Sequence, residues 1–184
     1  GELDVQTSLL GSFQVENVGM AVTAATEMRR AGFQIPDEAI LRGIAATRWP
    51  ARFQVIREEP LVLVDGSHNG PAATALSAAF VELFPGRKCR LVVGILSDKD
   101  LRGMAVALGP LASHVFACRP KSHRAYSAEE VASAFRAFAP GEAIPHVPAA
   151  IDAAILGTSS EDIILITGSI YTAGEALDHL GARP

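Results

Sequence analysis

The chain has 184 residues, of which 49% are hydrophobic, so it is long enough for one large domain or for one domain with an appendage. Its apolar runs, such as residues 61–64 and 163–166, are too short to cross a bilayer, which predicts a soluble protein with no membrane partner. A formal net charge of −4 and the lack of a dense Lys/Arg block argue against a nucleic-acid partner.

The N-terminal part of the chain predicts a short strand followed by two helices. Residues 1–10 alternate loosely between polar and apolar side chains, which favours a strand. Small and apolar residues recur at helical spacing over 15–31, and Gly32 supplies a helix stop. A second helix is predicted over 36–47, because a proline there precedes acidic residues in the first turn. The pair Trp49-Pro50 breaks the pattern and marks a domain boundary.

Beyond this boundary, apolar strands alternate with amphipathic helices. This alternation predicts an α/β fold whose mostly parallel sheet is covered by helices on both faces. The first two strands, 53–57 and 61–64, are too close in the chain for a crossover, so they must be antiparallel and the sheet is mixed. The other predicted elements are strands 89–95, 114–118, 144–147 and 162–167, and helices 72–84, 100–108, 127–138, 149–156 and 170–180.

A polar loop, Asp65-Gly66-Ser67-His68-Asn69, follows the predicted strand 61–64 and precedes a helix that Pro71 opens. It is predicted to lie at the carboxyl end of a parallel strand, where open α/β sheets bind ligands and a helix N-terminus favours anions. A purely structural interpretation stays open, because Asp-Gly is a common turn and Asn69 would serve as a helix cap.

Several familiar sites are not supported by the sequence. No G-x-G-x-x-G, G-x-S-x-G or G-x-x-x-x-G-K-[ST] pattern is present, which argues against a usual dinucleotide site, a hydrolase triad and a phosphate-binding loop. Cys89 and Cys118 lie in apolar segments, which favours buried thiols over a disulfide, and no Cys/His spacing predicts a metal site. A reducing cytoplasm fits these thiols.

Five short segments, taken together, match one family. They are Gly11-Ser12-Phe13-Gln14-Val15-Glu16-Asn17, Trp49-Pro50-Ala51-Arg52-Phe53, Asp65-Gly66-Ser67-His68-Asn69, Asp98-Lys99-Asp100 and Thr167-Gly168-Ser169-Ile170-Tyr171. With them the chain resembles the carboxyl-terminal part of the folylpolyglutamate synthase/dihydrofolate synthase family, in the Mur ligase superfamily. The family patterns are G-x-H-Q-x-x-N, W-P-G-R-F-E, D-G-A-H-N-P, D-K-D and G-S-x-Y/F, and the pairing of D-G-x-H-N with W-P-x-R-F is quite specific to it.

The sequence also departs from these patterns. Phe13 stands where many members have His, Ala51 replaces Gly, Gln54 replaces Glu, and Gly70 intervenes before the proline. We interpret these departures as family variation, although Phe13 removes a polar contact that His would offer.

The resemblance implies a role for each matching side chain. Asn17 corresponds to an Asn near the adenine of ATP, and Arg52 to a catalytic Arg that reaches the ATP phosphates. Asp65 corresponds to the Asp that binds the nucleotide, through ribose hydroxyls, and His68 to a catalytic His close to the nucleotide. The alternatives are an ordinary surface amide for Asn17, a surface ion pair for Arg52 and a loop histidine with no task for His68.

The remaining positions carry weaker implications. Lys99 is placed by the resemblance in a catalytic loop facing the acyl-phosphate and amino-acid sites, although Asp98 or Asp100 would equally serve as a helix cap. Ser169 and Tyr171 precede or begin a helix and are predicted to bind the glutamate carboxylate. A basic loop, which either attracts an anionic substrate or is merely solvated, contains Arg119, Lys121, His123 and Arg124. Three further histidines are assigned no function: His114, His146 and His179.

Members of the family join L-glutamate to folate or dihydropteroate with ATP and Mg²⁺, through an acyl phosphate. The resemblance implies that residues 1–50 are the tail of a central ATPase domain and residues 51–184 a Rossmann-like carboxyl-terminal domain. We therefore expect a piece of a longer protein, with the phosphate loop and all Mg²⁺ ligands upstream, no ligase activity in isolation, and a monomeric state. The alternatives are another Mur-type ligase, acting on murein peptides or cyanophycin, and a non-catalytic nucleotide-binding module.

Overall fold

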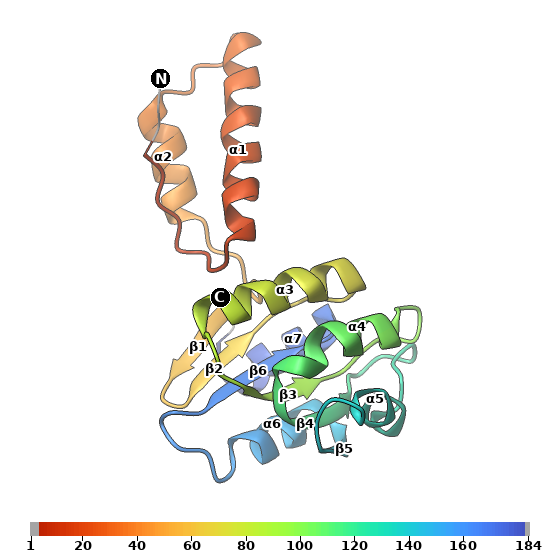
Figure 1. The fold of residues 1–184 in the computed structure, drawn as a ribbon. Helices are drawn as coiled ribbons and strands as arrows, with labels where there is room; N and C mark the ends of the chain where they lie inside the picture. Colours follow the sequence, from red (N-terminus) through yellow and green to blue (C-terminus); the bar gives the residue numbers. More distant parts are fainter. Residues whose placement is uncertain (1–3, 183–184) are drawn as a thin grey trace. The chain divides into compact units, whose positions relative to one another are not determined.

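A computed structural model describes residues 4–182 of the chain (Figure 1). The chain forms two compact units, which divide between Trp49 and Pro50. The smaller is a helical unit, and the larger is an α/β unit that carries a sheet. Among the described residues, no helix is long and apolar enough to span a membrane.

The helical unit consists of α1 (Phe13–Arg30) and α2 (Asp37–Ala46). The helix stop predicted at Gly32 is confirmed, because this glycine adopts a left-handed φ of 97° just after α1. The strand predicted within 1–10 is wrong for residues 4–10, which form no strand, and residues 1–3 lie outside the described part. The physical reason is the lack of a pairing strand among the described residues of this unit.

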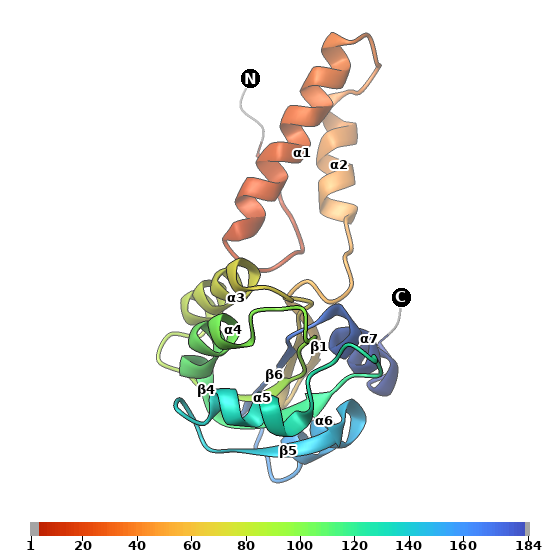
Figure 2. The same cartoon turned by 90° about the vertical axis from the view of Figure 1, so that its right-hand side faces the viewer.

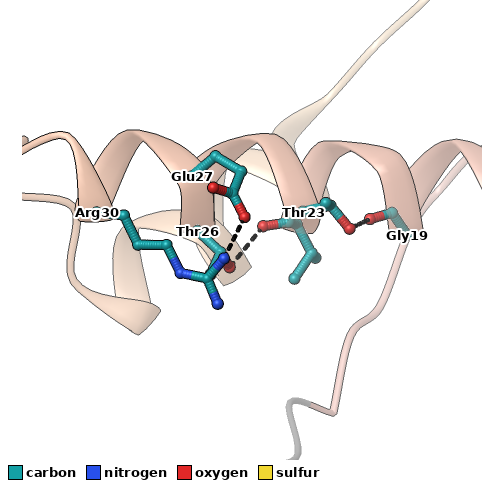
Figure 3. Close-up of polar contacts among 6 residues, drawn as sticks. Gly19, Thr23, Thr26, Glu27 and Arg30 are labelled. Carbon is teal, nitrogen blue, oxygen red and sulfur yellow. Dashed lines mark hydrogen bonds and ion pairs between the residues drawn. The ribbon is translucent and has the colours of Figure 1, made fainter.

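Some polar side chains on α1 bond within the helix (Figure 3), whereas Arg29 pairs with Asp37 of α2 at 2.5 Å. The hydroxyl of Thr23 donates to the Gly19 carbonyl at 2.8 Å, and Arg30 pairs with Glu27 at 2.6 Å. Apolar side chains of α1 are meanwhile left in solvent, with Met20 exposed by 66%. The helix therefore gains little stability from packing within its own unit.

The α/β unit is built on one six-stranded sheet with the order β1-β2-β6-β3-β4-β5. Its strands are β1 (Gln54–Glu58), β2 (Leu61–Val64), β3 (Cys89–Val93), β4 (Ala112–Arg119), β5 (Gly141–His146) and β6 (Ile163–Thr167). The pair β1–β2 is antiparallel and every other pair is parallel. The predicted mixed, mostly parallel sheet is thus confirmed, including the antiparallel hairpin at its edge.

Helices cover both faces of this sheet (Figures 1 and 2). One face carries α3 (Gly70–Leu83), α4 (Leu101–Leu108) and α5 (Ala128–Phe135), and a short 3₁₀ turn follows α4 at Gly109–Leu111. The other carries α6 (Val147–Ile155) and α7 (Ile170–His179), which pack on alternate side chains of the strands, such as Val64, Val92 and Ile166. Two-sided cover explains why the central strands β2 and β6 are near-continuous apolar runs rather than alternating ones.

Burial of apolar side chains on these strands stabilises the sheet. Leu63, Leu91 and Leu165 are each fully buried, which contributes about 2 kcal/mol per side chain relative to exposure. Both cysteines are free and buried, as predicted, and burial raises the pKa of each thiol to about 12. The elements predicted for the α/β unit are present, although β4 and β5 are longer than expected, β3 ends earlier, at Val93, and α5 ends earlier, at Phe135.

Candidate functional site

Parallel pairing brings the carboxyl ends of β2, β6 and β3 to one edge of the sheet. Val64 pairs with Ile166, and Thr167 pairs with Val93, so the loops after these strands start level with one another. The segments that begin at Asp65, Gly168 and Gly94 therefore lie side by side, which is where ligands bind in open α/β sheets.

Asp65 lies directly after β2, at the carboxyl ends of the strands, with only 4% of its surface exposed. Its Oδ2 accepts a hydrogen bond from the Phe53 backbone N–H, and its Oδ1 accepts one from the Ser67 N–H, both at 2.8 Å. The next residue adds a third link, because the Gly66 N–H donates to the Ala51 carbonyl at 2.7 Å. The Asp65 side chain thus joins the loop before β1 to the loop after β2.

Arg52 projects from the loop that Asp65 holds. Its neighbours Ala51 and Phe53 have φ values of 55° and 46°, a left-handed conformation that costs about 1 kcal/mol per non-glycine residue. The Phe53 ring is fully buried, and the Ala51 N–H donates to Oε1 of Gln54 at 2.9 Å. Arg52 itself is exposed, and its guanidinium forms no hydrogen bond or ion pair within the described part of the chain. It is therefore free to bind an anion.

His68 and Asn69 occupy the turn between β2 and α3. His68 is half-buried, with Nδ1 at 3.2 Å from the Gly66 carbonyl oxygen; a proton on Nδ1 makes this a hydrogen bond and leaves Nε2 as an acceptor. Asn69 caps α3 by accepting from the Ala72 N–H at 2.9 Å, the structural role left open by the sequence.

Ser169 and Tyr171 differ in their access to solvent. Ser169 is fully buried and caps α7, accepting from the Thr172 N–H at 3.0 Å, while its hydroxyl contacts the Thr172 hydroxyl at 2.8 Å. The latter donates to the Gly94 carbonyl at 2.8 Å, so the hydrogen-bonding capacity of Ser169 is largely used within the fold. Tyr171 is 46% exposed and remains accessible to a ligand.

Close backbone packing surrounds this cap. Gly168 has a φ of 108°, and a Cβ added there would lie 2.7 Å from the Gly94 carbonyl oxygen. A Cβ on Gly94 would lie 2.7 Å from the Thr172 hydroxyl. Neither position has room for a side chain, so glycine at both is what lets β3 and β6 end so close together.

Charged side chains from the loops after β3 and after β4 lie close together. Lys99 Nζ lies 2.9 Å from Asp98 Oδ2, and Arg124 Nη1 lies 4.0 Å from the same oxygen. The hydrogen bond from Lys99 is the main cause that lowers the pKa of Asp98. Asp100 accepts from the Gly103 N–H and caps α4, so of the two carboxylates considered as caps, Asp100 has that role. Lys99 is not free but ion-paired.

Asn17 belongs to the helical unit, where its side chain is exposed on α1. Its Nδ2 donates to Oε1 of Gln14 at 2.8 Å, which leaves Asn17 Oδ1 without a hydrogen bond within residues 4–182. Gln14 is 3% exposed, and its Nε2 has no hydrogen-bond partner in that same range.

The remaining basic and histidine side chains have few specific contacts. Arg119, Lys121, His123 and Arg124 are exposed, and the backbone N–H of Lys121 donates to Glu175 at 2.5 Å. His179 pairs with Asp152 at 2.7 Å and so links α7 to α6, while His114 lies 3.5 Å from Glu142. These side chains therefore make contacts on the surface of the α/β unit.

The structure adds two residues that the sequence did not single out for the site. Gln54 and Phe53 anchor the Arg52 loop, one through its side-chain oxygen and the other through its buried ring. The only sequence signal for Gln54 was its departure from the family pattern W-P-G-R-F-E, in which Glu stands at this position. Within residues 4–182, no group of three or more His, Cys, Asp or Glu side chains is placed to hold a metal ion.

A mixed, mostly parallel sheet with helices on both faces, and with polar loops gathered at the carboxyl ends of adjacent strands, defines a Rossmann-like α/β domain. A family model described as "Mur ligase, glutamate ligase domain" matches residues 51–170. The chain therefore belongs to the Mur ligase family.

The chain is also similar to individual folate-related ligases. A protein of Halobacterium salinarum, named as a probable bifunctional folylpolyglutamate synthase/dihydropteroate synthase, is 38% identical over 91% of this chain and 20% of the relative. The dihydrofolate synthase/folylpolyglutamate synthase of Escherichia coli is 30% identical over 89% of this chain and 38% of the relative. The chain thus spans well under half the length of these curated relatives.

Solved structures of such enzymes share the fold. The structure of Mycobacterium tuberculosis folylpolyglutamate synthase complexed with ADP has a TM-score of 0.86 and 29% identity, covering 98% of this chain and 43% of that one. A bifunctional folylpolyglutamate synthase/dihydrofolate synthase with Mn, AMPPNP and L-glutamate bound has a TM-score of 0.76 and 30% identity, covering 86% of this chain and 38% of that one.

Proposed function

We propose that this chain is the carboxyl-terminal part of an ATP-dependent ligase that adds L-glutamate to folate or dihydropteroate through an acyl phosphate. The observation that carries the proposal is that hydrogen bonds join the loop of Arg52 to the loop of Asp65 at the carboxyl ends of the strands. Within the described residues this arrangement presents an unpaired guanidinium on the loop that is tied to the segment leading into α3, in a chain similar to enzymes solved with ADP, AMPPNP and L-glutamate.

In this proposal each side chain has a task that suits its chemistry. Arg52 binds the ATP phosphates and stabilises the charge that develops as the γ-phosphate is transferred, for which a planar cation is well suited. His68 lies three residues from Asp65 in the same loop and contacts the nucleotide. Asp65 keeps the loop in place and offers its remaining lone pairs to the ribose hydroxyls.

Asn17 and Lys99 complete the proposed set. Asn17 reads the adenine through its amide, while Lys99, held by Asp98, faces the acyl phosphate. Tyr171 is the better candidate for contacting glutamate, because Ser169 is buried in the α7 cap.

Mg²⁺ and the triphosphate need groups that the described residues do not supply. Within them no cluster of carboxylate, histidine or cysteine side chains fits a metal ion, so no step here is assigned to one. We propose that the metal ligands and the phosphate loop belong to an upstream ATPase domain of the parent protein. The isolated chain is accordingly expected to form no ADP from ATP, L-glutamate and either folate substrate, and detectable turnover would contradict this.

The helical unit is proposed to be the tail of that ATPase domain. Large apolar side chains on α1 are mostly exposed in the described structure, including Val15 at 75% and Met20 at 66%. A fragment of residues 50–184 should then unfold cooperatively on its own, whereas a peptide of residues 1–49 should show little helix by circular dichroism. A stable helical peptide would argue for an independent domain instead.

The decisive experiment uses the full-length ligase that contains this chain. Arg52→Ala should lower kcat/KM by about 100- to 1,000-fold, because it removes a cation that stabilises developing charge. Arg57→Ala, which removes an exposed arginine of β1, is the matched control and should stay within about twofold of the parent. Unchanged turnover in Arg52→Ala would favour a non-catalytic nucleotide-binding module.

The amino acid and the carboxylate substrate are tested separately. The family model covers Mur ligases in general, so a ligase for murein peptides or cyanophycin is the other candidate. Measuring ADP formation with L-glutamate, L-aspartate and L-alanine against folate, dihydropteroate and murein-peptide acceptors separates the cases. The proposal expects turnover only with L-glutamate and a pterin-containing acid.

A further inference from the structure

We infer that Gln54 is a positioning residue for Arg52, holding the base of the arginine so that its guanidinium is presented in one place. The inference rests on the proposed function, because it concerns how Arg52 does its work. It is carried by the hydrogen bond from the Ala51 N–H to Gln54 Oε1 at 2.9 Å.

The residues on either side of Arg52 are held at several points. On one side, the Ala51 N–H is bound by Gln54 and the Ala51 carbonyl by Gly66. On the other, the Phe53 N–H is bound by Asp65 and the Phe53 ring is fully buried. The side chain between them is exposed and unpaired in the described structure, so its base is fixed while its head is free.

The backbone conformation explains why such anchoring is needed. Ala51 and Phe53 both have positive φ, which non-glycine residues avoid unless the surroundings impose it. Two hydrogen bonds, one on each side of Arg52, impose the positive φ here: Asp65 accepts from the Phe53 N–H, and Gln54 accepts from the Ala51 N–H. Losing the Gln54 acceptor allows the Ala51 peptide to relax towards an ordinary conformation, which moves the Cα of Arg52.

The position of Gln54 in the sheet makes it a firm support. It is the first residue of β1 and pairs with Val64, the last residue of β2. Its backbone is therefore fixed by the antiparallel hairpin, and its side chain reaches back only three residues, to Ala51. Gln54 touches the loop of Arg52 and is assigned no contact with substrate.

The test is a set of variants in the full-length ligase, assayed with ATP, L-glutamate and dihydropteroate. Gln54→Leu removes the acceptor, and Gln54→Asn keeps the amide but shortens its reach. Both should lower kcat/KM by roughly 10- to 100-fold, mainly through kcat, because a misplaced catalytic group costs about that much. Gln54→Glu keeps an acceptor at the same reach and should restore kcat/KM to within about threefold of the parent.

A double-mutant cycle separates positioning from a general loss of structure. If Gln54 acts through Arg52, then Arg52→Ala combined with Gln54→Leu should be no less active than Arg52→Ala alone. Gln34→Leu, at an exposed glutamine of the helical unit, is the control for the chemical change and should have no effect. Thermal melting checks that every variant is folded.

The outcomes distinguish this inference from the proposed function. Full activity of both Gln54→Leu and Gln54→Asn, together with a large loss in Arg52→Ala, overturns the positioning role and leaves the ligase intact. Multiplicative losses in the double mutant also overturn it, because Gln54 would then act independently of Arg52. No loss in Arg52→Ala would instead overturn the proposed function itself.

Discussion

The backbone N–H of Phe53 donates to the side-chain oxygen Oδ2 of Asp65 across 2.8 Å, although the two residues are 12 positions apart in the chain. The bond closes the ends of the β1–β2 hairpin, because Phe53 immediately precedes β1 and Asp65 immediately follows β2. The other oxygen of the same carboxylate accepts from the Ser67 N–H. One buried side chain thereby organises the two loops of the α/β unit in which Arg52 and His68 are proposed to contact the nucleotide.

Asp65→Asn should destabilise the chain by about 2 kcal/mol. An amide has one acceptor oxygen in place of two, so either the Phe53 or the Ser67 N–H would face an NH₂ group in a buried place. Urea unfolding of this chain measures the change. Glu58→Gln makes the same chemical change at an exposed position of β1 and should shift stability by less than about 0.5 kcal/mol.

Ala51→Gly should stabilise the chain by about 0.5 kcal/mol. Glycine adopts the observed φ of 55° without steric cost, which removes about 1 kcal/mol of strain, and its greater freedom when unfolded offsets part of that gain. Ala78→Gly, at an exposed position inside α3, should instead cost about 1 kcal/mol. If both variants lose stability equally in urea unfolding, the left-handed conformation at residue 51 is not strained.

Two buried threonines should respond in opposite ways to the same substitution. The Thr167 hydroxyl has no hydrogen-bond partner in the described structure, so Thr167→Val should be neutral or stabilising by up to about 1 kcal/mol. The Thr172 hydroxyl donates to the Gly94 carbonyl, so Thr172→Val should cost about 1–3 kcal/mol. Differential scanning calorimetry of the two variants gives the comparison, and a large loss in Thr167→Val would reveal a bond to water at that site.

The carboxyl group of Asp98 should titrate below its usual range. The hydrogen bond from Lys99 is the first cause that lowers its pKa. Because the folded-state pKa is lowered, the pair stabilises the fold fully above the unfolded-state value of about 3.9, and that stabilisation is lost as pH falls through the folded-state pKa. Carbon-13 NMR titration should show the midpoint rising in Lys99→Met, whereas an unchanged midpoint would mean that the Lys99 pair does not form in solution.

Much of the fold could be predicted from the sequence because its local signals agree with each other. Apolar strands, helix starts at Pro71 and Ser127, and the short link between β1 and β2 all indicate the same mixed sheet. The strand expected within residues 1–10 was wrong for residues 4–10, since alternation alone does not make a strand without a partner. Alternation of polar and apolar residues is a property of one segment, whereas a strand also needs a second segment to pair with.

The candidate site could be located but not resolved from sequence. The loop after β2 was predicted because polar residues follow an apolar run, and the parallel register confirms its place at the sheet edge. Which way a side chain points was beyond the sequence: it could not show that Asp65 would hold backbone N–H groups or that Ser169 would be buried in a helix cap. Gln54 looked like a simple departure from a pattern, whereas its oxygen anchors Ala51.

Hydrogen bonds at Ala51 and Phe53 hold the backbone around residue 52, and within residues 4–182 the arginine side chain forms none. The side chain at residue 52 can therefore be replaced without loss of the contacts that hold its backbone, so its binding role is separable from the folding of the domain. Such a protein can change its ligand specificity at one residue with little loss of thermodynamic stability.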